Sequence, residues 1–91
     1  MKLEQFYEII TERKKTMPDN SYVASLFREG CDRIIQKIGE EATEVVIAAK
    51  NSDKKRLIEE ISDLWFHMLV LLASKNISLD EINEELEKRQ K

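Results

Sequence analysis

Hydrophobic side chains recur every three or four residues along most of the chain, and short polar breaks interrupt them. This spacing predicts helices that each carry an apolar stripe. Residues 3–15 show it first, and Pro18-Asp19-Asn20 then breaks the helix. No stretch alternates for long as a strand does. The pattern therefore predicts an all-α fold of four or five helices.

Polar residues and glycine at the breaks set the expected helix ends. Ser21 can cap a short helix, and Gly30 can stop it. Asp32 can start the next helix, and either Ser52 or Asp53 can cap the one after it. The pattern Ser78-x-x-Glu81 is a capping box. The expected helical segments are, approximately, residues 3–15, 21–29, 32–50, 53–74 and 78–89.

The two long segments should form the centre of the fold. In the segment 53–74 the second half is apolar nearly all round, which is typical of a central helix. The segment 32–50 has a single apolar stripe with a helical period, which we expect to face the core. Its members are Ile35, Ile38, Ala42, Val45, Val46 and Ala49.

Acidic residues lie on both long segments in matching positions. Glu41 and Glu44 are three apart, as are Glu60 and Asp63, so each pair shares one helical face. A short turn centred on residue 52 predicts an antiparallel hairpin. Glu44 is then level with Glu60, and Glu41 with Asp63. All four acids should fall within one helical turn, about 5 Å along the axis.

Four carboxylates this close would repel one another, and their desolvation would be costly. Protonation, intruding basic side chains or bound cations could offset the repulsion. Oxygen ligands suit hard cations such as Mg²⁺, Mn²⁺ or Ca²⁺, and Mg²⁺ commonly joins carboxylates to substrate phosphates. The pattern thus indicates phosphoryl chemistry. The alternative is that these acids are ordinary solvent-facing residues of two helices.

Composition narrows the class of protein. The chain has 91 residues, 42% of them hydrophobic, and we expect residues 1–91 to form one domain that self-association would help to stabilise. The net charge of −3 argues against a nucleic-acid binder. Cys31 is the only cysteine, which favours a reducing, cytoplasmic location. The longest apolar run, 64–73, contains His67 and is about half a membrane span, so no membrane segment is expected.

The string SYVASLFREGCDRIIQKIGEEATEVVIAAKN, residues 21–51, resembles phosphoribosyl-ATP pyrophosphohydrolase of the all-α NTP pyrophosphohydrolase superfamily. The superfamily pattern E-E-x-x-E followed by E-x-x-D reads here as Glu40-Glu41-x-x-Glu44 and Glu60-x-x-Asp63. The resemblance implies Mg²⁺-dependent hydrolysis of phosphoribosyl-ATP to phosphoribosyl-AMP and pyrophosphate in histidine biosynthesis, with Mn²⁺ as a substitute. It also implies a homodimer or higher homo-oligomer, in the stand-alone form that lacks the cyclohydrolase partner domain.

The same resemblance assigns roles to individual residues. Four acids match the family's metal ligands, namely Glu41, Glu44, Glu60 and Asp63. Glu40 matches a further acid of the motif, as a base, as a holder of water or as a surface residue. The candidates for substrate contact are Lys37, Arg33, His67, Ser21 and Tyr22.

Four of these candidates for substrate contact also have a structural interpretation. Lys37 could pair with Glu41 one turn later, and Ser21 could simply cap its helix. His67 lies in the apolar run LWFHMLVLL, where a histidine is typically a core residue bonded to a neighbour. Tyr22 is expected to pack against the core.

Two other functions compete with the leading one. The first is a housecleaning NTP or dNTP pyrophosphatase that uses the same acids. The second is a non-catalytic helical dimerisation module with solvated acids, which would show no dependence on a cation.

Overall fold

A computed structural model of the chain describes residues 1–90 and contains five helices. They are α1 (Leu3–Thr16), α2 (Tyr22–Glu29), α3 (Cys31–Lys50), α4 (Lys54–Ser74) and α5 (Leu79–Arg89). The described residues include no strand, so the all-α prediction is confirmed. Within this same range no helix is long and apolar enough to cross a membrane.

The predicted caps form, with one shift. The Ser21 side chain accepts a hydrogen bond from the Ala24 amide at 3.2 Å, and Asp53 accepts one from the Arg56 amide at 3.1 Å. Ser78 and Glu81 complete the capping box at the start of α5. The helix expected from Asp32 begins at Cys31 instead, as α3.

Gly30 explains that shift, because it ends α2 and starts α3 at once. Its amide donates to the Leu26 carbonyl, and its carbonyl accepts from the Arg33 and Ile34 amides at 3.2 and 3.3 Å. Its φ of 101° lies in the region that side chains other than hydrogen disfavour. One glycine thus replaces a loop between the two helices.

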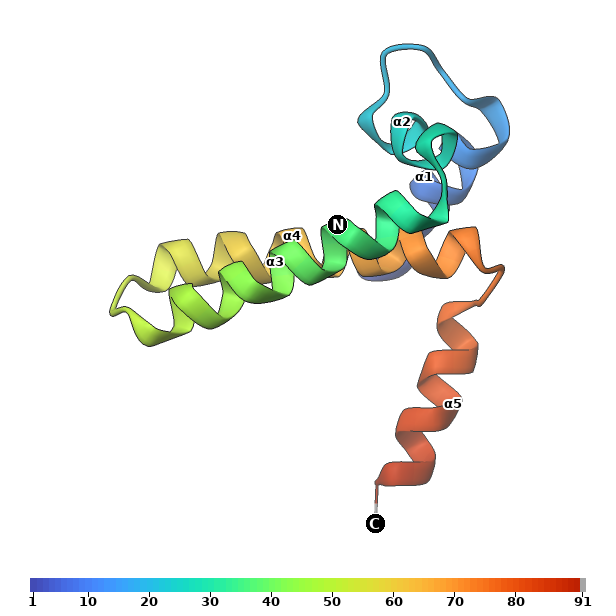
Figure 1. Ribbon diagram of the computed structural model, residues 1–91. Coiled ribbons are helices and arrows are strands. Elements are labelled where there is room, and N and C mark those ends of the chain that lie inside the picture. The colour runs from blue at the N-terminus through green and yellow to red at the C-terminus, as the bar shows by residue number, and fades with distance from the viewer. Residues whose placement is uncertain (91) are drawn as a thin grey trace.

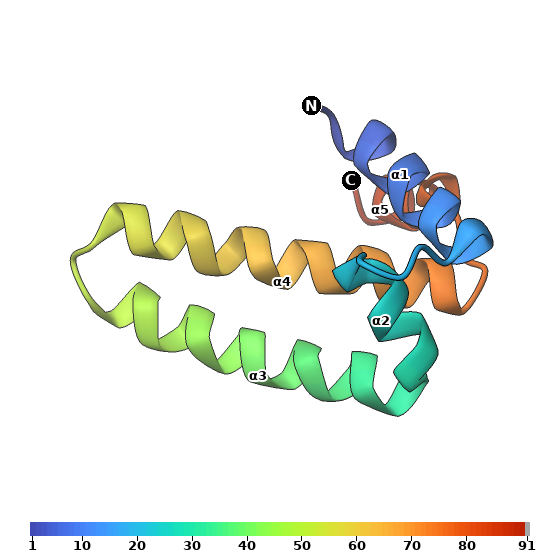
Figure 2. The ribbon, with the colours of Figure 1, turned by 90° about the horizontal axis from the view of Figure 1, so that it is seen from above.

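The chain folds back on itself at residues 51–53, so that α3 and α4 form an antiparallel hairpin (Figure 2). Helices α1 and α2 cover the C-terminal half of α4, as Figures 1 and 2 show. The buried core lies between these elements and comprises Ile10, Val23, Leu26, Ile34, Leu69, Val70 and Ala73. The second half of α4 is central, as predicted, although Trp65 and Met68 stay about half exposed.

The predicted core stripe of α3 is wrong in part. Ile35, Val46 and Ala49 are exposed, whereas Ile34 and Ala48 are buried. The reason is that the stripe is broad, and only one edge of it turns toward α4. The face that meets α4 also carries Glu41, whose side chain is only 13% exposed. Glu41 therefore sits on the packing face itself, and an apolar flank of α3 is left open.

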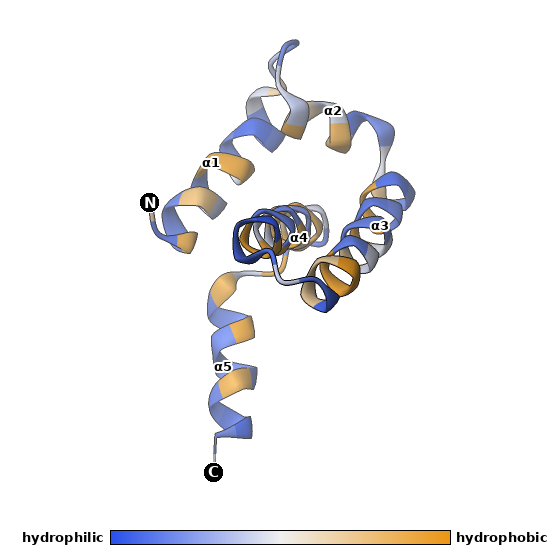
Figure 3. Cartoon of the chain, turned by 90° about the vertical axis from the view of Figure 1, so that its left-hand side faces the viewer, coloured by the Kyte–Doolittle hydropathy of each residue, from blue (hydrophilic) through white to orange (hydrophobic). Residues whose placement is uncertain are grey.

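Helix α5 leaves the other helices sharply. The Ile77 amide donates to the Leu72 carbonyl at 2.9 Å, and the Asn76 amide donates to the Ala73 carbonyl at 3.2 Å. With Asn76 at a φ of 57°, this is the Schellman arrangement that ends a helix. It confirms the stop predicted near Asn76. Figures 1 and 3 show α5 projecting on the side away from α1 and α2.

Candidate active site

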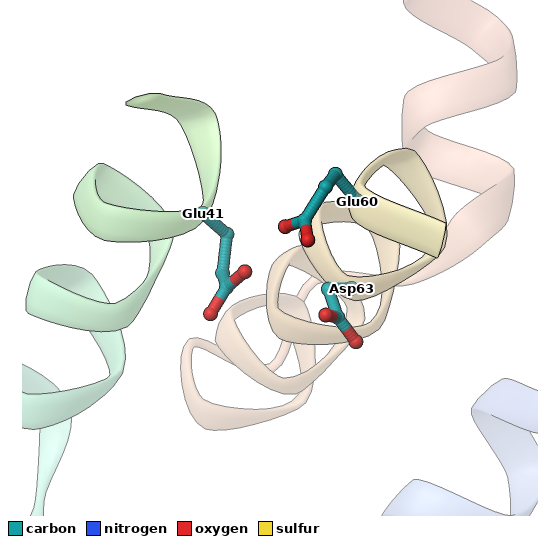
Figure 4. Close-up of side chains that lie close together, drawn as sticks. All are labelled: Glu41, Glu60 and Asp63. Atoms are coloured by element: carbon teal, nitrogen blue, oxygen red, sulfur yellow. The ribbon is translucent and has the colours of Figure 1, made fainter. Parts of the chain in front are cut away.

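The hairpin brings three of the four predicted acids together. Oxygens of Glu41, Glu60 and Asp63 lie within 4.8 Å of one another, with Glu41 reaching across from α3 to the other two on α4 (Figure 4). This is the closeness that the register about residue 52 predicted. The exposed fraction of the Glu60 side chain is 15%, so the group lies partly within the interface between the helices.

The donor set fits a hard divalent cation. All three ligand atoms are carboxylate oxygens, the type that Mg²⁺ and Mn²⁺ prefer. Oxygens that share one Mg²⁺ at about 2.1 Å lie roughly 3–4 Å apart, so small side-chain rotations would close the set. The remaining positions of an octahedral ion would stay open to water or phosphate oxygens.

The pKa of Glu60 reflects both its burial and the repulsion from the neighbouring acids. Burial raises the pKa of its carboxyl group, Arg56 opposes that rise, and the charges of Glu44, Asp63 and Glu41 add to it. The other three predicted acids thus all act on Glu60. A bound cation would relieve this repulsion.

Glu44 lies outside the group of three. Its carboxylate is 3.5 Å from the Arg56 guanidinium, which also lies 3.7 Å from Glu60. The basic side chain therefore bridges the two helices beside the acids. Arg56 was not among the predicted site residues. Its position one turn before Glu60 was the available signal, because residues four apart share a helical face.

Lys37 lies at the other edge of the group. Its ammonium is 3.4 Å from Glu41 and 3.5 Å from Glu40, and its side chain is largely buried. Glu40 is exposed and also accepts a hydrogen bond from Gln36, which is the main cause that lowers the pKa of its carboxyl group. The predicted pairing of Lys37 with Glu41 is confirmed. Glu40 is held toward Lys37 rather than joined to the three acids.

Two of the remaining candidates, His67 and Tyr22, contact each other. His67 is buried, and its Nδ1 lies 2.8 Å from the Asp63 carbonyl oxygen. Its Nε2 lies 3.1 Å from the Tyr22 hydroxyl, and the Tyr22 ring stacks on Phe66. His67 is thus a core residue bonded to its neighbours. Arg33 pairs loosely with Glu29, at 3.9 Å.

Comparison with known sequences matches residues 3–90 to the sequence model described as phosphoribosyl-ATP pyrophosphohydrolase. The chain belongs to this family. The match covers all five helices, including both that carry the acids. The resemblance based on residues 21–51 is therefore confirmed over nearly the whole chain.

Two relatives that share one name are similar to this chain over nearly their whole length. The chain is 56% identical to a phosphoribosyl-ATP pyrophosphatase of Leptospira biflexa, over 98% of this chain and 94% of that protein. It is 46% identical to the protein of the same name from Methanocella arvoryzae, over 98% and 96%. A histidine biosynthesis bifunctional protein, HisIE of Caldanaerobacter subterraneus, is 51% identical over 98% of this chain and 43% of its own length.

Proposed function

We propose that this chain hydrolyses phosphoribosyl-ATP to phosphoribosyl-AMP and pyrophosphate, in histidine biosynthesis. Its family and the names of its relatives support this reaction. The observation that carries the chemistry is the group of Glu41, Glu60 and Asp63, since a polyphosphate substrate arrives with the divalent cation that such a group can hold.

We propose Mg²⁺ as the ion at this group, with Mn²⁺ as a substitute. Glu41, Glu60 and Asp63 would hold it, and Glu44 would join them if Arg56 turned aside. When bound, the ion would polarise phosphate oxygens and lower the pKa of a water molecule. Glu40, at the edge of the site, is our candidate for orienting that water.

Cationic side chains at the edge of the site would neutralise negative charge on the substrate's phosphates. Burial works to lower the pKa of Lys37, but Tyr22, Glu41 and Glu40 raise it overall, so its ammonium stays charged. Lys37 thus places a fixed positive charge beside the acids, where a phosphate oxygen could replace one of its carboxylate partners. Arg33, one turn earlier on α3, extends this basic edge. We also propose substrate contact by Tyr22, which begins α2, and by Ser21, which caps that helix.

Release of pyrophosphate tests the proposal directly. Phosphoribosyl-ATP should be hydrolysed in the presence of Mg²⁺, and chelation should abolish the reaction. A panel of NTPs and dNTPs measured under the same conditions addresses the housecleaning alternative. Higher kcat/KM on any of these than on phosphoribosyl-ATP would overturn the narrower assignment.

Calorimetry separates an enzyme from a non-catalytic module. Wild type should bind Mg²⁺ or Mn²⁺, and Asp63→Asn should lose most of that binding, whereas the exposed Glu59→Gln on the same helix should retain it. Heats that are identical for all three proteins would favour acids that are merely solvated.

We further propose that residues 1–91 act as a single domain and that the enzyme is a homodimer in the cytoplasm. Large apolar side chains remain exposed on α3, α4 and α5, among them Val46, Trp65 and Leu86, which supports self-association. A lone cysteine suits a reducing compartment.

A further inference from the structure

The acids lie between two unlike ends of the α3–α4 hairpin. Arg56 is one turn before Glu60 on α4, toward the hairpin turn. His67 is one turn after Asp63, and these four positions fall within about 60° round the helix. A cation therefore borders the acids on the side of the turn, and the His67–Tyr22 pair borders them on the opposite side. A substrate that spans the acids can lie in either of two directions, and the chemistry of the two ends distinguishes them.

The end away from the turn carries a stack of aromatic rings. The Phe66 ring stacks on Phe6 with 5.8 Å between centroids, and on Tyr22 with 6.0 Å, at an angle of 25° in each pair. Tyr22 ends this stack and is 51% exposed. Its hydroxyl lies 3.1 Å from Nε2 of the buried His67, a contact that orients the ring. An oriented, exposed aromatic ring is a surface on which a planar base can stack.

The turn end has cations and no aromatic ring. Residues 50–56 include none of Phe, Tyr or Trp. The cationic residues are Lys50, Lys54, Lys55 and Arg56. Arg56 reaches the acids through two long contacts, 3.5 Å to Glu44 and 3.7 Å to Glu60. Because a guanidinium binds phosphate oxygens two at a time, a diphosphate beside the acids would draw Arg56 away from Glu44. This end therefore suits a leaving pyrophosphate and offers no platform for a base.

Arg33 is a further cation on α3, at the end away from the turn. It lies one turn before Lys37 and two turns before Glu41, within about 80° round the helix. Its ion pair with Glu29 is 3.9 Å long and joins side chains that are 37% and 54% exposed. Such a pair is weak, so a phosphate group could displace the carboxylate.

The substrate has matching parts in the same order. Phosphoribosyl-ATP carries a triphosphate at one end and the 5′-phosphate of a second ribose at the other, with the adenine between them. When the α-phosphate is at the acids and the adenine is on Tyr22, the triphosphate continues toward Arg56. The second ribose then extends away from the turn, toward Arg33.

We propose that phosphoribosyl-ATP lies in this one direction along the hairpin, with its adenine stacked on Tyr22, its phosphoribosyl phosphate at Arg33 and its leaving pyrophosphate at Arg56. This inference rests on the proposed reaction and adds which residue recognises each part of the substrate. Arg56 and His67 are eleven residues apart on α4, about 16 Å along the axis, so the two ends contact different parts of one molecule. Arg33 is then the residue that distinguishes this substrate from an ordinary NTP, which lacks the second phosphate.

Calorimetric binding of pyrophosphate, AMP and phosphoribosyl-AMP, in buffer with Mg²⁺, tests the direction. Arg56→Gln should raise the Kd of pyrophosphate about tenfold and leave the Kd of AMP unchanged, because one charge-assisted contact is lost. Arg33→Gln should raise the Kd of phosphoribosyl-AMP about tenfold and leave the other two unchanged. Arg89→Gln, which breaks the exposed pair with Glu85, is the control and should change none of the three.

Two results of this experiment would overturn the proposal. Weaker binding of AMP, with unchanged binding of pyrophosphate, in Arg56→Gln would mean that the substrate lies in the opposite direction. An unchanged preference of Arg33→Gln for phosphoribosyl-AMP over AMP would remove the second phosphate from Arg33.

The stacking contact needs its own pair of variants, because loss of the Tyr22 hydroxyl also affects His67. Tyr22→Phe and Tyr22→Leu both lack the hydroxyl, but only the first keeps a ring. The Kd of AMP should be about tenfold higher for Tyr22→Leu than for Tyr22→Phe, with equal Kd values for pyrophosphate. Tyr22→Trp, which has a larger ring, should bind AMP at least as tightly as Tyr22→Phe, and this comparison stands even if Tyr22→Leu does not fold. Equal AMP binding by the Leu and Phe variants, or weaker binding by the Trp variant, would refute stacking.

Binding and turnover can fail separately. The expected pattern of Kd values without release of pyrophosphate from phosphoribosyl-ATP would sink only the proposed reaction. Normal release with the opposite pattern of Kd values, or with none, would sink only the direction of the substrate.

Discussion

The Tyr22 hydroxyl lies 3.1 Å from Nε2 of His67, which is 4% exposed. A carbonyl oxygen only accepts hydrogen bonds, so His67 donates from Nδ1 to the Asp63 carbonyl. In the neutral ring Nε2 is then the acceptor, and Tyr22 donates to it. This pair ties the start of α2 to the part of α4 that carries Asp63.

Loss of the Tyr22 hydroxyl should leave a buried acceptor unpaired. We expect Tyr22→Phe to lower the free energy of unfolding by about 1–3 kcal/mol. In a double-mutant cycle, His67→Leu should cost less in the Tyr22→Phe background than in wild type, because the shared bond is already gone. Denaturant unfolding of the four proteins measures the coupling. Additive losses would show that the two side chains do not interact.

Tyr7 gives a prediction for alkaline pH. Its hydroxyl donates to the Ile77 carbonyl, between α4 and α5. Burial, and then the charge of Glu81, raise the pKa of Tyr7 above 10.0, so the folded chain favours the neutral phenol. This contribution to stability should be complete below pH 10 and should be lost as pH rises through the folded pKa.

Comparison with Tyr7→Phe isolates that effect. The variant should be less stable than wild type by about 1 kcal/mol near neutral pH, because one hydrogen bond is missing. The difference should shrink as pH rises past 10, where wild type gives up the same bond. Thermal unfolding of both proteins across this range provides the measurement. A gap that stays constant to high pH would refute the role of the neutral phenol.

Local rules in the sequence predicted much of this structure. Ser21, Asp53 and Ser78 each accept a hydrogen bond from the amide three residues later, so these caps could be predicted from the local sequence. The closeness of Glu41 to Asp63 followed from helical geometry and the position of one turn. In each case a few neighbouring residues determine the outcome.

Longer-range features could not be read in the same way. Tyr22 and His67 are 45 residues apart, and no local pattern pairs them. The apolar stripe on α3 is wide enough to include both the side that faces the core and an exposed flank. Periodicity alone therefore did not show that Ile34 faces inward and Val46 outward. The Glu44 carboxylate pairs with Arg56 on another helix, and no local pattern in the sequence predicts this contact.

Substitutions in the acid group should separate catalysis from stability. We expect Glu41→Gln and Asp63→Asn to lower kcat by about 10²-fold or more, through loss of charge at the phosphate-binding ion. In metal-free buffer both variants should be as stable as wild type or more so, because a repelling charge is removed. Pyrophosphate release and denaturant unfolding give the two readings. Glu59→Gln, an exposed neighbour, should leave both unchanged.

The opposite result would identify the acids as structural. Marked destabilisation of Asp63→Asn without metal, together with turnover close to wild type, would mean that the carboxylates support the fold rather than hold an ion.

Replacement of Arg56 should lower stability in metal-free buffer, whereas replacement of an acid should not. It contacts both Glu44 and Glu60, so Arg56→Gln removes a cation that bridges them. More than half of the Arg56 side chain is exposed, and such pairs contribute no more than about 1 kcal/mol, so the loss of stability in metal-free buffer should be small.

Added Mg²⁺ should stabilise the Arg56→Gln variant by more than it stabilises wild type, since the ion no longer competes with a guanidinium for Glu44. Thermal unfolding with and without Mg²⁺ measures this difference, and Arg89→Gln, which breaks the exposed pair with Glu85, is the control. An equal Mg²⁺ effect in wild type and Arg56→Gln would show that Arg56 and the ion do not share the same carboxylates.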